Sequence, residues 1–330
     1  MQTRIETFFL KTMLLLAVAL TSVPVIAQNH SEVSALVIDT KYLKDKIGKP
    51  EWVIMDVRLP DEYAKGHIPG AVLIQEWISN VFSRDTRLTP AMVPRMEKAM
   101  GEMGVGNESH IIIYGSRFNT PWIPSIFWAF EIMGCNSSLS THTVQIYGGG
   151  IEQWQQDGGN LDQGETKATP AMFKPALVPE RSAKIEEIME VVKGRKKAVF
   201  IDARTAKEYE GKEVTSLRGG HIPKAVNVDF MKNLDPDSAR LKPLSELKSL
   251  YQDIPSDSRV ITYCHTGFRG SFTYAILRAL GYKNVALYRD GWRVYGSTNL
   301  DVPAENETWV DFGKVNNAVK AVWTLKAKME

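Results

Sequence analysis

Residues 260–271 read VITYCHTGFRGS, and this stretch decides how the rest of the chain is interpreted. β-favouring residues run straight into a cysteine, Cys264, and a polar loop separates it from a helical run, 272–280, that Gly281 ends. A cysteine between the carboxyl end of a strand and the start of a helix meets unpaired N–H groups and the positive end of the helix dipole. Because this environment favours an anion, we predict that Cys264 is a nucleophilic thiolate.

The alternative for Cys264 is a buried free cysteine that packs as a small hydrophobic residue. Its loop is polar and contains glycine, and Arg269 adds a fixed positive charge a few residues away. These neighbours favour the reactive interpretation over the packing one.

The composition is that of an ordinary globular protein, with 330 residues, 44% hydrophobic and 24% charged. This length suits two domains. The net charge of +2, without a polybasic run, gives no reason to propose a nucleic-acid partner. The histidines lack metal-ligand spacing, so we expect neither a metal nor another cofactor.

The first residues have the order of a secretory signal peptide. Arg4 and Lys11 precede a short apolar run, 13–20, and a small-residue pattern that ends at Ala27. So short a run does not span a bilayer stably, so we expect a signal peptide at 1–27, export to the periplasm and no stable membrane span after cleavage. An uncleaved membrane anchor is the alternative.

The chain contains a weak internal repeat. Residues 52–72 and 199–226 share Asp-x-Arg, Glu-Tyr and Gly-His-Ile-Pro-x-Ala-Val in the same order, and the second copy carries eight extra residues within 210–219. A strand, a glycine-terminated helix and another strand follow in each copy. This alternation predicts an α/β protein with two tandem domains, each a parallel sheet with helices on both faces.

The two copies set the domain boundaries. We expect an inactive domain at 28–156 and a catalytic domain at 180–330 that includes an amphipathic helical tail, 308–326. The segment 157–179 is rich in Gly, Thr and Pro and is the expected linker.

The first domain lacks the thiol, because Cys264 aligns with Gly115 in a longer loop that contains prolines. It therefore cannot perform thiol chemistry, and we expect it to serve packing and to wall the site. The second cysteine, Cys135, follows the far end of the helix beside that loop. A disulfide between Cys135 and Cys264 is the default in an exported protein, and it would need the two Cα atoms to lie close together. Because the helix of about ten residues spans roughly 15 Å and Cys135 belongs to the other domain, we expect Cys135 to be structural.

These blocks and the Cys-x-x-Gly-x-Arg loop resemble the rhodanese family of sulfurtransferases, in tandem-domain form. The resemblance implies that Cys264 attacks the outer sulfur of a donor such as thiosulfate, keeps it as a persulfide and passes it to a thiophilic acceptor such as cyanide. Loop residues expected to surround the donor and the persulfide are His265, Thr266, Gly267, Phe268, Arg269 and Gly270.

Individual loop residues have expected roles. Backbone N–H groups would hold the persulfide anion, and Gly267 would allow the tight turn. Arg269 would orient the donor or stiffen the loop through backbone carbonyls. Where animal rhodaneses carry cations, this chain has Glu208 and His265-Thr266, which leaves Arg269 and a partly protonated His265 to attract thiosulfate.

Arg204 has two interpretations, as a substrate-binding residue or as a brace of the fold. Asp202 and Arg204 recur in the inactive copy as Asp56 and Arg58, and this duplication favours bracing. The same argument gives a structural hydrogen bond to His67 and His221.

Two rival functions follow from the same cysteine. Related phosphatase loops have five residues between cysteine and arginine, whereas four separate Cys264 from Arg269, which suits one sulfur atom better than a phosphate. The other rival is a periplasmic persulfide carrier with a protein sulfur acceptor. Within the enzyme interpretation, 3-mercaptopyruvate is the alternative donor.

Overall fold

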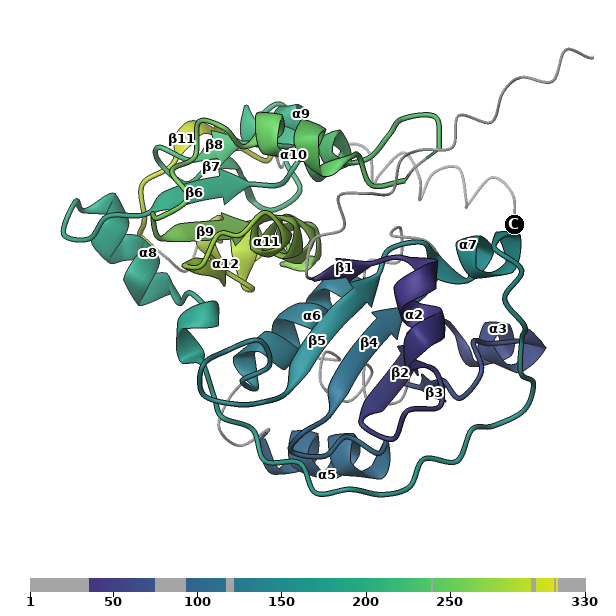
Figure 1. Ribbon diagram of the computed structural model, residues 1–330. Helices are drawn as coiled ribbons and strands as arrows, with labels where there is room; N and C mark the ends of the chain where they lie inside the picture. Colours follow the sequence, from purple (N-terminus) through teal and green to yellow (C-terminus); the bar gives the residue numbers. More distant parts are fainter. Residues whose placement is uncertain are drawn as a thin grey trace, which may run out of the picture. The chain divides into compact units, whose positions relative to one another are not determined.

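The internal repeat folds into two parallel sheets (Figure 1). The structure, a computed structural model, describes residues 36–74, 93–116, 122–238, 240–297, 301–311 and 313, all within one compact unit. The predicted signal peptide at 1–27 lies outside these residues.

The first sheet has the strand order β1-β5-β4-β2-β3, with every neighbouring pair parallel. Its strands are β1 (Val37–Ile38), β2 (Trp52–Asp56), β3 (Val72–Leu73), β4 (His110–Tyr114) and β5 (Thr143–Tyr147).

The second sheet has the order β10-β9-β6-β8, again all parallel. An isolated parallel bridge between Ser182 and Leu287 takes the place beside β10 that β1 takes beside β5. Its strands are β6 (Val199–Asp202), β8 (Val226–Asn227), β9 (Val260–Tyr263) and β10 (Val285–Leu287).

Helices cover both faces of each sheet, as the sequence predicted. In the first domain, α5 (Val93–Glu102) and α6 (Trp122–Ile132) pack on one face, and α2 (Thr40–Lys46) and α7 (Gly150–Gln156) on the other. In the second, one face holds α10 (Leu244–Leu250) and α11 (Phe268–Ala279), and the other holds α8 (Ile185–Val192) and α12 (Gly291–Tyr295). Shorter elements are α3 (Pro60–Lys65), η3 (Pro179–Arg181), α9 (Ala206–Tyr209) and η4 (Phe230–Asn233).

Helices α6 and α11 join the two domains. From Ile123 to Ile132 every residue of α6 is buried, as expected for a helix that is apolar all round. The buried carboxylate of Glu131 accepts hydrogen bonds from Tyr274 and from Arg278 of α11. One apolar core therefore runs through both domains, and the inactive domain contributes packing beside the helix that follows Cys264.

Cys135 belongs to this shared core. Both cysteines are free thiols, and burial, together with the charge of Glu131, raises the pKa of Cys135 well above its usual value. A thiol in this environment stays protonated and unreactive, in agreement with the structural role predicted for it.

The segment 157–179 hydrogen-bonds along the first domain. The backbones of Asp162 and His67 bond to each other in both directions, at 2.9 and 3.0 Å. Further along, the amides of Ala171 and Ala176 donate to carbonyls in α5 and just after α6. The connection between the domains is therefore held against the first domain by its backbone.

The expected helical tail is wrong at its start. Thr308 and Trp309 lie in β11 (Glu305–Trp309), which pairs antiparallel with β7 (Arg218–His221). The Thr308 hydroxyl also donates to the carbonyl of Gly211 at 2.6 Å. The extra stretch of the second copy supplies Arg218 and Gly219 of β7, and this pairing overrides the helical periodicity. Beyond residue 313 the expected helix lies outside the described residues.

Among the helices that the structure describes, none combines the length and the apolar character needed to cross a bilayer.

Candidate active site around Cys264

Cys264 lies where the central strand of the second sheet ends. Strand β9 is fully buried between β6 and β10, so its carboxyl end holds the cysteine at a fixed point of the sheet edge. Helix α11 begins at Phe268, four residues earlier than the predicted 272. Arg269 and Gly270 therefore lie in the first helical turn instead of the loop, because the Ser271 amide closes that turn on the carbonyl of Gly267 at 2.8 Å.

The sulfur of Cys264 accepts a hydrogen bond from the amide of Gly267, with a distance of 3.0 Å between Sγ and N. Cys264 is 1% exposed, and its own carbonyl accepts from the Trp292 amide at 2.7 Å. The thiol is thus fixed on both sides and faces the N-terminus of α11, where the helix dipole favours negative charge. Of the amides predicted to surround the sulfur, Gly267 is the one with a hydrogen bond to it in the described chain.

Gly267 is required for two reasons. Its φ of +90° lies in the left-handed region, as the predicted tight turn demands. In addition, a Cβ at this position would lie 2.5 Å from Nη1 of Arg289 and 2.7 Å from its backbone oxygen. Any side chain here would push the loop away from the residue behind it.

Arg269 hydrogen-bonds to a carboxylate instead of the backbone carbonyls predicted for it, and its role in orienting the donor stays a prediction. Its guanidinium forms two hydrogen bonds with the buried carboxylate of Glu208, at 2.5 and 2.9 Å. Burial lowers the pKa of Arg269, but the bonds to Glu208 and the charge of Cys264 outweigh it, so the pKa is raised and the charge is kept. The sequence predicted only that a cation is missing at position 208. In the structure the carboxylate of Glu208 is the partner that holds Arg269.

Glu208 is itself fixed by a capping box at the start of α9. Thr205 accepts from the Glu208 amide at 3.2 Å, and the Glu208 carboxylate accepts from the Thr205 amide at 3.2 Å. Burial raises the pKa of Glu208, but the bonds from Arg269 more than compensate, and the net direction is downward. The carboxylate is therefore charged at neutral pH.

His265 is not the partly protonated cation that we expected. Burial lowers its pKa, nearby arginines lower it further, and Glu208 only partly opposes them, so the ring is neutral at pH 7. Its Nδ1 lies 3.2 Å from the hydroxyl of Thr215. Thr215 belongs to the eight extra residues of the second copy, and sequence reasoning did not connect this insertion with the loop.

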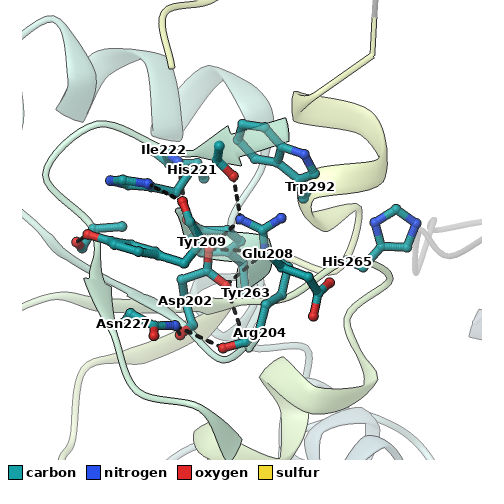
Figure 2. A network of polar contacts seen from close by, with 12 residues as sticks. Asp202, Arg204, Glu208, Tyr209, His221, Ile222, Asn227, Tyr263, His265 and Trp292 are labelled. Atoms are coloured by element: carbon teal, nitrogen blue, oxygen red, sulfur yellow. Dashed lines mark hydrogen bonds and ion pairs between the residues drawn. The ribbon is translucent and has the colours of Figure 1, made fainter. Parts of the chain in front are cut away.

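Arg204 is buried and braces the fold. It is 1% exposed and bonds to Asp202 at 2.6 Å and to the carbonyl of Gly220 at 2.6 Å. Figure 2 shows this network beside Trp292, whose ring lies 4.8 Å from the guanidinium carbon, with His265 to one side. This burial favours the bracing interpretation, and the substrate-binding interpretation stays a prediction.

The inactive domain repeats this brace. Arg58 bonds to Asp56 at 2.6 Å and to the carbonyl of Gly66 at 2.8 Å. The histidines repeat as well: each ring stacks on the tyrosine of its Glu-Tyr block and bonds to that tyrosine's carbonyl through Nδ1, at 3.1 Å for His67 and 2.8 Å for His221. Recurrence in a domain without the thiol marks these groups as structural, as predicted.

Gly115 occupies the position of Cys264 in the first domain. Its carbonyl accepts from the Ile151 amide at 2.9 Å, as that of Cys264 accepts from Trp292. The two copies therefore superpose at this residue, and the predicted loss of the thiol is confirmed in space. The rest of the first loop, 117–121, lies outside the described residues.

Arg289 is a functional candidate that sequence reasoning missed. It follows Tyr288 at the end of β10, where the first domain has Gly148 after Tyr147. Its guanidinium is buried behind the Cys264 loop and donates to the carbonyl of Thr266. The aligned repeat contained the signal, since an arginine in one copy replaces a glycine in the other.

Thr266, Phe268 and Gly270 complete the predicted set. The Phe268 ring lies 4.4 Å from the guanidinium carbon of Arg289. Gly270 packs so closely on β9 that a Cβ there would lie 3.0 Å from the Tyr263 backbone. Within the described residues no group of three His, Cys, Asp or Glu side chains is arranged to hold a metal.

Replacing Gly267 separates backbone strain from the contact with Arg289. Gly267→Ala and Gly281→Ala both place alanine at positive φ, but Gly281 has nothing within 4 Å of its added Cβ. The strained φ should cost each variant about 1 kcal/mol of unfolding free energy, and Gly267→Ala should lose more, because its Cβ would also clash with Arg289. Only Gly267→Ala should also slow alkylation of Cys264 by iodoacetamide, by at least about tenfold. Equal alkylation rates in the two variants would contradict the role given to the turn.

Glu208→Gln tests the ion pair with Arg269. A carboxyl group whose pKa is lowered on folding stabilises the protein at pH values above its unfolded pKa, which is 4.5 for Glu208. This stabilisation is lost as the pH falls through the lower pKa of the folded state. In urea unfolding, Glu208→Gln should lose about 2 kcal/mol at pH 7 and match the parent protein near pH 2. Glu210→Gln, at an exposed neighbouring position, is the control and should show no such pH dependence. A stability difference between Glu208→Gln and the parent protein that persists at pH 2 would contradict the ion pair as its cause.

Comparisons with known proteins agree with this geometry. Residues 39–157 and 186–298 each match the rhodanese-like domain family. A thiosulfate sulfurtransferase from Pseudomonas aeruginosa is 28% identical over 279 residues, 82% of this chain and 97% of the relative. A sulfur carrier protein from Thermus thermophilus is 28% identical over 289 residues, 81% of this chain and 95% of the relative.

A solved structure gives the same result. The crystal structure of SseA from Escherichia coli, a 3-mercaptopyruvate sulfotransferase, has a TM-score of 0.63 and 29% identity, and it covers 78% of this chain and 98% of its own. The family resemblance seen in the sequence is therefore confirmed. This chain belongs to the rhodanese family, as a two-domain sulfurtransferase.

Proposed function

We propose that this sulfurtransferase takes the sulfane sulfur of thiosulfate onto Cys264 and passes it to a thiophilic acceptor. The observation that carries the proposal is the hydrogen bond from the Gly267 amide to the Cys264 sulfur at the start of α11. A thiolate at this point is favoured by the amide and by the helix dipole. The first domain has Gly115 at the matching position, so one thiol serves the chain.

The reaction runs in two displacements. The Cys264 thiolate attacks the outer sulfur of thiosulfate, a new S–S bond forms, and sulfite leaves with the electron pair of the old one. The acceptor, cyanide in an assay, then attacks the outer sulfur of the persulfide and the thiolate is regenerated. Both the thiolate and the persulfide are anions, so the same amide and dipole serve each state.

Thiosulfate as donor is supported by the name of the Pseudomonas relative and by the charges near the loop. Arg269 and Arg289 both interact electrostatically with Cys264, so positive charge is present although His265 is neutral. Thiosulfate carries two negative charges and 3-mercaptopyruvate one, and the pairing of Arg269 with Glu208 reduces the advantage of the dianion. A direct comparison of the two donors therefore decides the reaction's name.

The test is thiocyanate production from cyanide by the purified protein, with thiosulfate or 3-mercaptopyruvate as donor. Faster turnover of thiosulfate supports the proposal, and preference for 3-mercaptopyruvate replaces the donor but keeps the mechanism. Cys264→Ser should abolish transfer with either donor and leave thermal unfolding unchanged. Cys135→Ser is the matched control and should keep turnover within about twofold, because its thiol is buried in the shared core.

A second candidate function is a sulfur carrier that delivers its persulfide to another protein. The Thermus relative named as a sulfur carrier protein favours it. A carrier would gain one sulfur atom on Cys264 from the donor, measured by mass spectrometry, yet pass it to cyanide slowly. Fast thiocyanate production would instead favour the enzyme with small-molecule acceptors.

We also propose that the protein acts in the periplasm after removal of residues 1–27. The support is the basic, apolar and small-residue order of that segment. Amino-terminal sequencing of protein from cell fractions should give Gln28 as the first residue in the periplasmic fraction. Protein that keeps Met1 in the cytoplasmic fraction would contradict export, and protein that keeps it in the membrane fraction would indicate an anchor.

A further inference from the structure

Arg289 lies behind the Cys264 loop and is not a reacting group in either displacement of the proposed reaction. It stands at the carboxyl end of β10, next to β9, so the two neighbouring strands deliver the arginine and the cysteine to the same sheet edge. The inactive domain has Gly148 there, which makes the arginine specific to the copy with the thiol.

The guanidinium contacts three consecutive residues of the loop. Nη1 donates a hydrogen bond to the carbonyl of Thr266, and the same atom lies 2.5 Å from the place that a Cβ of Gly267 would take. The guanidinium carbon lies 4.4 Å from the centre of the Phe268 ring. The Thr266 carbonyl and the Gly267 amide belong to the same peptide unit, so Arg289 binds one end of the unit whose other end donates to the sulfur.

The charge of Arg289 also acts on the sulfur. Arg289 is 4% exposed, and burial lowers its pKa to about 10, while the charge of Cys264 raises it. With a pKa of about 10 the guanidinium remains a cation at pH 7. A buried cation is screened little by solvent, so it favours an anion nearby more strongly than an exposed arginine does.

We propose that Arg289 is a positioning residue for sulfur transfer: it holds the turn 266–268 so that the Gly267 amide points at the sulfur, and it places a fixed positive charge behind the thiolate and the persulfide. This inference rests on the proposed role of Cys264. The other charged or titratable groups that act on the loop, on Arg269 or on Arg289 are Asp202, Arg204, Glu208, His265, Arg269, Asp290 and Arg293.

The test measures the rate of Cys264 alkylation by iodoacetamide against pH, in a Cys135→Ser background so that one thiol reports. Arg289→Met removes the charge and the hydrogen bond at similar length. It should move the midpoint of the alkylation profile upward by about one pH unit, which is about tenfold less thiolate below the midpoint. Arg195→Met, which removes an exposed arginine three residues after α8, is the control for net charge and should leave the midpoint unchanged.

Arg289→Lys separates charge from position. Lysine keeps the cation but cannot reproduce the planar guanidinium over Phe268 and the bond to Thr266 together. It should hold the midpoint within a few tenths of a pH unit and lower kcat for thiocyanate production by about tenfold. The lysine variant also serves if the methionine variant does not fold.

An unchanged midpoint in folded Arg289→Met, or unchanged kcat in Arg289→Lys, would overturn the proposal. The alkylation profile needs no sulfur donor, so it separates this inference from the proposed function. A shifted midpoint in a protein that transfers no sulfur would leave the role of Arg289 in place and reject the donor chemistry. Normal sulfur transfer with an unshifted midpoint would reject the role of Arg289 and leave the donor chemistry in place.

Discussion

The structure depends on a buried ion pair at the carboxyl end of one strand in each domain. Asp202 and Arg204 lie beside Tyr263, the residue before Cys264. The Tyr263 hydroxyl accepts a hydrogen bond from the amide of Ile222. Removing either charge would leave the other buried and unpaired, which costs about 3–5 kcal/mol. The pair therefore fixes how β6, β7 and β9 meet, and the position of the cysteine follows from that junction.

Duplication has separated support from chemistry in this chain. The first domain keeps the brace of Asp56 and Arg58 and its stacked histidine, but it has Gly115 in place of the cysteine. Its contribution is α6, an apolar helix that shares a core with α11 and gives α11 a buried carboxylate, Glu131, to bond. The helix whose N-terminus faces the sulfur is thus anchored at its far end by the inactive copy.

The charges around the sulfur are arranged for an anion that forms and disappears. Glu208 holds Arg269 in the first turn of α11, His265 is kept neutral by burial, and Arg289 lies behind the turn. None of these groups has to exchange a proton for sulfur transfer, because the chemistry moves electron pairs between sulfur atoms. Fixed dipoles and fixed charges are sufficient for such a reaction, since they need no rearrangement as it proceeds.

The sequence by itself determined the two-domain parallel architecture and showed that the first copy lacks the cysteine on which the proposed chemistry depends. These follow from local order, because strand and helix periods, glycine stops and a repeated motif are written along the chain. Only the tertiary structure decided the partner of Arg269, the neutrality of His265, the bracing role of Arg204 and the place of Arg289. Each of these depends on burial or on a contact between residues at least sixteen positions apart in the sequence, and a motif contains neither. The strand at 305–309 has the same cause, since its partner β7 begins within an insertion almost ninety residues earlier.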